Sequence, residues 1–180
     1  MLTPSLKTHR FTIRAFTAAD LELFTHYRSQ PEVAKYQSWS DFNYADALSL
    51  FEKMDYQNFG VVGAWYQLAI ADCESDILLG DLAVHFIDDE QVEIGFTIAP
   101  ANQQKHVAKE AAVALLGYLF NTLNKHRVVA TTDAQNVASY RLLESLGFRR
   151  EAHFRQNIFF KGAWGDEYQY AMLRTEQATA

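Results

Sequence analysis

A polar stretch between an alternating apolar segment and a helical pattern holds residue types that suit phosphate binding. It runs from Gln103 to Glu110 and follows Pro100, which ends the apolar segment. A helix N-terminus presents unpaired backbone N–H groups and a partial positive charge, so it attracts anions. Lys105 and Lys109 add positive charge here. Taken alone, such a stretch is more often an ordinary polar loop that starts an amphipathic helix.

A second candidate group lies further along the chain, at Asn136 and Ser139. Asn136 stands where an N-cap belongs, before a helical pattern, and Ser139 falls in the first turn. Either both face a ligand in a cleft beside the preceding strand, or Asn136 only caps the helix and Ser139 is only tolerated. The six histidines show no metal-ligand spacing, and no Gly-rich Rossmann or P-loop motif is present in the sequence.

Hydrophobic periodicity predicts the elements that position these groups. A period of two indicates strands and a period near 3.6 indicates helices. We expect strands at residues 10–16, 65–71, 77–86, 91–98, 127–132, 149–158 and 168–173. We expect one helix to begin at residue 17, and three more to cover residues 44–54, about 107–123, and 137–146. The strands of residues 65–98 form an antiparallel meander. The strand–helix–strand unit over 91–132 needs a crossover, so those two strands should be parallel within a mixed sheet.

The composition suits one globular domain, residues 1–180 with a core of about 6–174. Hydrophobic residues make up 49% of the 180 residues, and the formal net charge is -6. The acidic balance argues against a nucleic-acid-binding protein. The single cysteine, Cys73, has no partner for an internal disulfide. The longest apolar run, residues 113–120, is too short to span a membrane, and no secretory signal is seen. We therefore expect a soluble cytoplasmic protein, as a monomer or homodimer.

In their order along the chain, these segments resemble the GNAT N-acetyltransferase superfamily, and most closely its RimJ/RimL-like branch. The resemblance covers about Leu6 to Arg174. It rests on Glu93-Ile94-Gly95-Phe96 with Ile98 and Pro100, Gln103 to Ala111, His126-Arg127-Val128, Thr132-Asp133, Asn136 with Ser139, Gly147-Phe148-Arg149, and Gly162, Trp164 and Asp166. It implies an α/β (α+β) GNAT fold: a mixed, mostly antiparallel central sheet of about six to seven strands, splayed at the cofactor site and flanked by about four helices.

The resemblance also implies acetyl-CoA as co-substrate, with no metal. The pantetheine arm would pair with the backbone of Phe96, Thr97 and Ile98. The family's pyrophosphate loop, Gln/Arg-x-x-Gly-x-Gly/Ala, falls on the segment Gln103, Gln104, Lys105, His106, Val107 and Ala108. Asn136 and Ser139 would lie near the pantetheine and the thioester sulfur.

The chain departs from this pattern at His106, which replaces the first glycine of the loop. Glycine tolerates positive φ, whereas another residue pays ~1–2 kcal/mol in the left-handed region. Three alternatives follow. The loop adopts negative φ and keeps its N–H groups aimed at phosphate, His106 adds an imidazole contact, or the cofactor site is degraded. We favour the first, because the donors are backbone atoms.

For the chemistry, Glu93 is the first candidate for the general base, since many relatives carry a catalytic acid on that strand. Asp81 and His85 are held in reserve. Glu93 is otherwise a surface carboxylate. Many GNAT enzymes place a Tyr seven residues after the Asn; that position is Leu143 here, so Ser139 becomes the candidate to orient or relay a proton to the leaving thiolate.

The acceptor site is predicted at Tyr36, Trp39 and Asp166. Tyr36 and Trp39 line it or simply pack, and Asp166 lines it or anchors the last hairpin. The reaction would be transfer of an acetyl group from acetyl-CoA to a primary amine, on a small molecule or a protein N-terminus, by direct attack on the thioester. The alternative is a non-catalytic acyl-CoA-binding or regulatory module.

Overall fold

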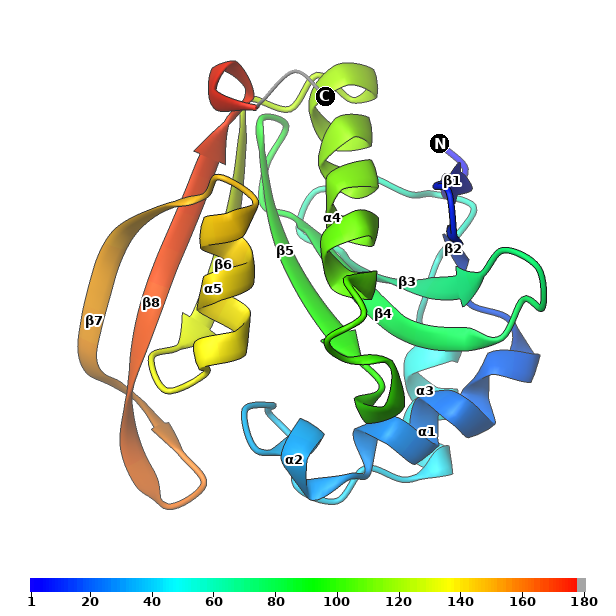
Figure 1. Ribbon diagram of the computed structural model, residues 1–180, viewed down its shortest axis with the longest axis horizontal. Helices are drawn as coiled ribbons and strands as arrows, with labels where there is room; N and C mark the ends of the chain where they lie inside the picture. The colour runs from blue at the N-terminus through cyan, green and yellow to red at the C-terminus, as the bar shows by residue number, and fades with distance from the viewer. Residues whose placement is uncertain (178–180) are drawn as a thin grey trace.

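The computed structural model describes residues 1–177 and is built around one mixed sheet (Figure 1). Its eight strands lie in the order β1-β2-β3-β4-β5-β6-β8-β7. The strands are β1 (Leu6–Lys7), β2 (Phe11–Ala15), β3 (Trp65–Asp72), β4 (Leu78–Phe86), β5 (Gln91–Ile98), β6 (Arg127–Asp133), β7 (Arg149–Phe160) and β8 (Ala163–Leu173). The helices are η1 (Ala18–Asp20), α1 (Leu21–Arg28), α2 (Pro31–Ala34), α3 (Tyr44–Glu52), η2 (Pro100–Asn102), α4 (Val107–Gly117), η3 (Tyr118–Thr122), α5 (Val137–Ser145) and η4 (Arg174–Glu176).

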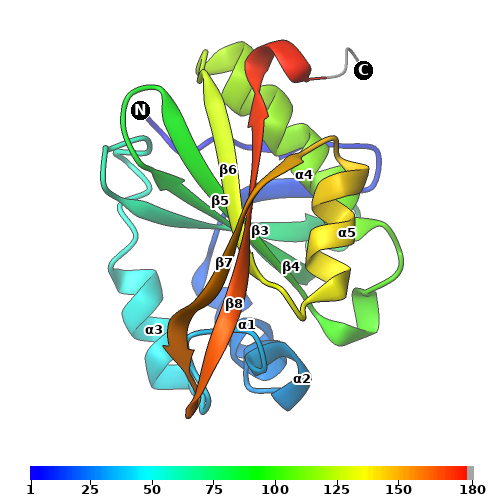
Figure 2. The same ribbon diagram turned by 90° about the vertical axis from the view of Figure 1, so that its left-hand side faces the viewer.

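The sheet is antiparallel except at one pair, β5 and β6, which α4 connects. This parallel pairing is short. It joins Gln91 to Arg127, Val92 to Val128 and Glu93 to Val129, and then stops. Figure 1 shows β5 and β6 diverging from that point, and in Figure 2 the two strands cross at an angle. The fold therefore opens one strand edge in the middle of the sheet.

Two apolar cores cover the two faces of the sheet. On one face, α4 and α5 pack over the long strands, with Leu115, Leu119 and Leu143 in the larger core. On the other face, α1 and α3 enclose a smaller core around Phe24 and Phe42. The alternation of β5 follows from this arrangement, because Val92, Ile94 and Ile98 belong to the larger core. Glu93, Gly95 and Thr97 face the opposite side.

The predicted architecture, a mixed and mostly antiparallel sheet that splays, is confirmed. Within the described residues there are eight strands where about six to seven were predicted, and α1–α5 where about four helices were predicted. The two-residue strand Leu6–Lys7 is too short to show a period. Pro31 occupies the first turn of α2, where its missing N–H costs nothing.

Two boundaries differ by more than two residues. The helix predicted for 107–123 changes after Gly117 into the π-helical turn η3. The last strand, predicted to begin at residue 168, begins at Ala163. The β7–β8 hairpin continues beyond the residues that pack against the core. Of the predicted domain 1–180, residues 178–180 lie outside the described residues. Among the described residues, no helix is both long and apolar enough to cross a bilayer.

Candidate active site

The opened strand edge begins at Glu93, the last residue of β5 that pairs with β6. Beyond it, Phe96 and Thr97 are half-buried and remain paired only with β4 on their other side. Backbone N–H and C=O groups removed from water need partners. The edge between Glu93 and Ile98 is therefore suited to pair with an extended ligand, as the sequence predicted for a pantetheine arm.

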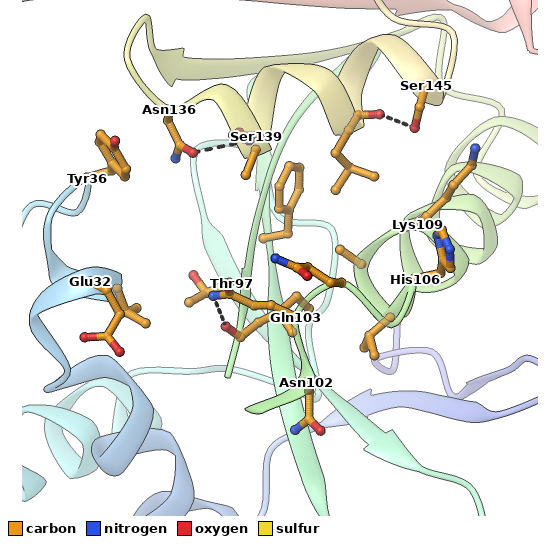
Figure 3. Close-up of a pocket in the computed structure, with 18 of the residues that line it drawn as sticks. Glu32, Tyr36, Thr97, Asn102, Gln103, His106, Lys109, Asn136, Ser139 and Ser145 are labelled. Atoms are coloured by element: carbon orange, nitrogen blue, oxygen red, sulfur yellow. Dashed lines mark hydrogen bonds between the residues drawn. The ribbon is translucent and has the colours of Figure 1, made fainter. Parts of the chain in front are cut away.

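Two cavities meet at this edge. One has a volume of about 570 Å³ and the other about 450 Å³. They share part of their walls, namely Tyr36, Gln37, Phe96, Thr97, Asn136 and Ser139. We call the first the cofactor cavity, because every residue predicted to bind the cofactor lines it, except Lys105. Figure 3 shows this cavity between α5 on one side and the segment of Thr97 and Gln103 on the other. We call the second the acceptor cavity, because Tyr36 and Trp39, predicted at the acceptor site, line it.

The predicted pyrophosphate loop has a left-handed backbone at two non-glycine residues. Gln104 has φ +59° and His106 has φ +60°. The favoured prediction of negative φ at His106 is therefore wrong. Alternating the sign of φ curls successive N–H groups to one side and makes an anion-binding concavity. The conformation costs ~1–2 kcal/mol per residue, so something else in the structure must offset it.

The loop's backbone donors are free to bind a ligand. Among the described residues, the N–H groups of Gln104, Lys105 and His106 make no hydrogen bond within the chain. Val107 begins α4, and the first-turn N–H groups of a helix have no intrahelical partner. Together they form a continuous run of donors at the positive end of a helix.

Some side chains around the loop line the cofactor cavity, and others hold the loop in place. Gln103 lines the cofactor cavity and also donates from Nε2 to the Ile98 carbonyl at 3.1 Å, which ties the loop to β5. Lys109 lines the cavity, whereas Lys105 does not. The Lys105 carbonyl instead accepts a hydrogen bond from Arg10 Nη1 at 3.1 Å. The positive side chain at the cavity is therefore Lys109.

Asn136 and Ser139 lie where the two cavities join. The Asn136 side-chain oxygen accepts the Ser139 backbone N–H at 3.2 Å, so Asn136 does cap α5. Both residues also line both cavities, so capping is not the whole of their placement. Leu143 is buried in the larger core, with 1% of its surface exposed. A leucine side chain cannot donate a proton. The hydroxyl of α5 that lines both cavities is that of Ser139.

Three half-buried carboxylates line the acceptor cavity: Glu93, Asp133 and Glu167. Asp133 and Glu167 are direct cross-strand neighbours on β6 and β8. Like charges at such positions destabilise a sheet unless a cation lies nearby. Sequence reasoning named Glu93 but gave no acceptor role to Asp133. The signal was the pairing of the two strands, which a single sequence does not reveal.

The two reserve candidates for the base behave differently. Asp81 is buried and accepts hydrogen bonds from Tyr27, Gln67 and Arg28, the last at 3.0 Å. Burial, and then the charge of Asp81, raise the pKa of Tyr27 well above its usual value, so that Tyr27 stays a donor. Asp81 lines the acceptor cavity, but both of its carboxylate oxygens are already occupied by these three donors.

His85 is the neighbour of Glu93 across β4 and β5. Its Nδ1 lies 3.8 Å from Glu93 Oε2 and has no hydrogen bond within the described chain. Its ring stacks on Trp65, with centroids 4.5 Å apart. Glu93 and Trp65 line the acceptor cavity, but His85 does not. His85 is therefore placed behind Glu93 and not in contact with the acceptor space.

Tyr36 and Trp39 both line the acceptor cavity. The Tyr36 hydroxyl donates to the Gln135 carbonyl at 3.3 Å, across the opening between the α2 segment and the start of α5. Trp39 Nε1 donates to the Arg28 carbonyl at 3.0 Å, and the Arg28 guanidinium lies 4.3 Å from the centre of the Trp39 ring. Trp39 is thus both a wall of the cavity and part of the smaller core.

Asp166 is not brought to either cavity. Its carboxylate accepts from the Gln156 backbone N–H at 2.8 Å and contacts His153 and Arg155 at 2.9 and 3.2 Å. The Gln156 hydrogen bond, then the one from His153, holds the pKa of Asp166 below its usual value. The acceptor-binding interpretation of Asp166 is therefore replaced by its alternative, anchoring of the last hairpin. Glu167, the next residue, lines the cavity instead.

No cluster of three or more His, Cys, Asp or Glu side chains suited to hold a metal is found in the described part of the chain.

Comparisons with known proteins identify the family of the chain. Residues 10–149 match the family described as "Acetyltransferase (GNAT) domain". The chain is 34% identical over 172 residues to the uncharacterised N-acetyltransferase YnaD of Bacillus subtilis, covering 95% of this chain and 98% of that one. A crystal structure of a GNAT-family acetyltransferase from Bacillus anthracis superposes with a TM-score of 0.86 and 32% identity, covering 96% of this chain and 100% of that one.

A more distant structure shares the fold. It is a spermidine N-acetyltransferase from Vibrio cholerae in complex with CoA and spermine, with a TM-score of 0.81 and 22% identity, covering 94% of this chain and 98% of that one. The chain belongs to the GNAT acetyltransferase family. It is an acetyl-CoA-dependent acyltransferase, and the GNAT fold predicted from the sequence is confirmed.

Proposed function

We propose that the chain transfers the acetyl group of acetyl-CoA to a primary amine, which enters through the acceptor cavity and attacks the thioester directly. One observation carries this proposal. The two cavities share a wall at Phe96, Thr97, Asn136 and Ser139, just beyond the point where β5 and β6 part. The pyrophosphate binds at residues 103–108 on one side of that wall, and the amine approaches from the other.

Glu93 is the general base in this proposal. The attacking amine must lose a proton, directly or through water, and Glu93 is a half-buried carboxylate at the start of the opened edge. Ser139 lies on the opposite wall and orients the thioester or relays a proton to the leaving thiolate. The backbone N–H groups of the opened β5 edge offer stabilisation to the developing oxyanion.

The acceptor is a cation before it reacts. Asp133 and Glu167 face the acceptor cavity as adjacent like charges, and an ammonium ion would relieve their repulsion. Tyr36, Trp39 and Trp65 add aromatic faces that also favour cations. A polyamine, such as the spermine in the complex of the Vibrio cholerae enzyme, and a protein N-terminal amine both fit this chemistry.

We also place the chain in the RimJ/RimL-like branch, as part of the same proposal. Its support is the ordered set of motifs and Leu143 in place of the tyrosine that many GNAT enzymes carry.

The test measures CoA thiol release from acetyl-CoA against a panel of peptides with free N-termini, polyamines and aminoglycosides. We expect turnover with at least one primary amine and none with its N-acetylated form. Calorimetry with CoA is run alongside. CoA binding without thiol release across the panel would favour a non-catalytic module, and absence of binding at millimolar CoA would remove the cofactor site from the proposal.

A further inference from the structure

The pyrophosphate loop holds a conformation that its own residues disfavour. Gln104 and His106 are both left-handed, and neither is glycine. The chain has no glycine between Gly95 and Gly117 that a shift in register would bring to either position. A contact from outside the loop must therefore stabilise it.

Arg10, the residue before β2, makes that contact. Its Nη1 donates to the carbonyl of Lys105, which lies between the two left-handed residues. This carbonyl belongs to the same peptide unit as the His106 N–H. In a trans peptide the two groups point in opposite directions. Holding the Lys105 carbonyl toward Arg10 thus turns the His106 N–H away from Arg10.

Glu110 fixes the guanidinium of Arg10 in turn. Glu110 Oε2 accepts from Arg10 Nε at 2.8 Å, and Oε1 accepts from the Arg10 backbone N–H at 3.0 Å and from Thr8 Oγ at 2.6 Å. Burial alone would raise the pKa of Glu110, but hydrogen bonds from Thr8 and Arg10 lower it below its usual value. The carboxylate therefore stays ionised near neutral pH and joins the β1–β2 turn to the first turn of α4.

We propose that Arg10, fixed by Glu110, is a positioning residue for acetyl-CoA. It holds the pyrophosphate loop in the left-handed conformation that a glycine would adopt unaided. The inference rests on the proposed function, because it assigns the loop to the cofactor's pyrophosphate. Arg10 thereby substitutes for the glycine that the family has at the position of His106, although it is 95 positions from Lys105 in the sequence.

The experiment compares Arg10→Gln in two backgrounds, the natural chain and His106→Gly. In the natural background we expect the Kd for CoA to rise about tenfold, which corresponds to about 1.4 kcal/mol. In the glycine background the same change should cost less than about threefold, since position 106 then adopts its left-handed backbone without strain. The KM for acetyl-CoA should follow the Kd, while the KM for the amine and kcat at saturating cofactor stay constant.

Arg149→Gln is the matched control. The Arg149 side chain is 49% exposed and that of Arg10 is 42% exposed, and each is ion-paired with glutamate, but Arg149 is the first residue of β7 and lines neither cavity. We expect no change in CoA affinity there. Should Arg10→Gln fold poorly, Arg10→Lys keeps a charge beside Glu110 without the fork that reaches both partners. It should lose CoA affinity and regain it in the glycine background.

The outcomes distinguish a failure of the proposed function from a failure of this inference alone. If the natural chain binds no CoA, the proposed function fails and this inference fails with it. If the natural chain binds CoA and Arg10→Gln binds it equally well, only the inference is overturned. An equal loss of affinity in both backgrounds would also overturn it, because Arg10 would then act by charge and not by holding the loop.

Discussion

Substitution of Gly80 by alanine tests whether the opened edge of β5 depends on close packing with β4. Gly80 pairs with Ile98 at the end of that edge. A Cβ at position 80 would lie 2.5 Å from the Thr97 carbonyl oxygen, 2.8 Å from Ile98 Cδ1 and 3.0 Å from Ile98 Cα. Two of these three atoms belong to the backbone, so the clash is relieved only by moving β5. The moving residues are those that should pair with the pantetheine arm.

The magnitude follows from two opposing effects. Overpacking costs about 1–3 kcal/mol, and contacts with backbone atoms place this site near the upper end. Replacing glycine within a strand returns roughly 0.5–1 kcal/mol through the unfolded chain. The net destabilisation is about 2 kcal/mol, which lowers Tm by roughly 4–8 °C for a chain of this size. CoA affinity should fall as well, because Thr97 and Ile98 shift.

Gly117→Ala is the control for this substitution. Gly117 has helical dihedrals and no atom within 4 Å of the added Cβ. Alanine there should stabilise the protein by about 1 kcal/mol and raise Tm by roughly 2–4 °C. Differential scanning calorimetry of both variants and titration with CoA give the result. A Tm for Gly80→Ala equal to that of the natural protein, with unchanged CoA affinity, would refute the packing argument.

Three further predictions concern charged groups. Glu93→Gln should lower kcat about 10²–10³-fold with little change in CoA affinity; a loss below threefold in steady-state kinetics would exclude Glu93 as the base. Glu167→Gln should raise the KM of the amine about fivefold and leave that of acetyl-CoA unchanged, and the opposite pattern would contradict the acceptor-cavity assignment. A hydrogen bond from Arg127, with a second guanidinium, lowers the pKa of Glu151 from 4.5 to about 2. Its contribution to stability, about 1 kcal/mol or less for a surface network, is complete above pH 4.5 and is lost toward pH 2. Urea unfolding should therefore show the gap between natural protein and Glu151→Gln closing across that range, and a constant gap would contradict it.

The sequence predicted the elements around the cofactor cavity well because their patterns are long and regular. β5 alternates over its whole length, and its predicted bounds, 91–98, are those observed. α4 begins at the predicted Val107, after polar residues that do not fit its apolar stripe. The cap at Asn136 follows from local chemistry alone. These features depend on neighbours in sequence, so a single chain reveals them.

Features that depend on contacts between distant strands could not be predicted in this way. Asp133 and Glu167 become adjacent only through the pairing of β6 with β8. The predicted acceptor role of Asp166 failed for a related reason. Side chains alternate along β8, so the neighbours Asp166 and Glu167 point to opposite faces of the hairpin, and Glu167 is the one that faces the acceptor cavity. The family motif indicated the right region, but the strand pairing decided which carboxylate faces the cavity.

The error at His106 shows how a local rule is overridden. From the sequence, a non-glycine residue should avoid positive φ, and that expectation is sound for an isolated loop. The structure instead places a guanidinium against the carbonyl next to it and holds that guanidinium with a carboxylate on the following helix. Strain of this kind persists at sites where the surrounding structure fixes the backbone, and it is common where a ligand must be bound. A missing glycine in a phosphate loop therefore does not by itself mean a degraded site, provided that a distant group fixes the peptide whose N–H must face the phosphate.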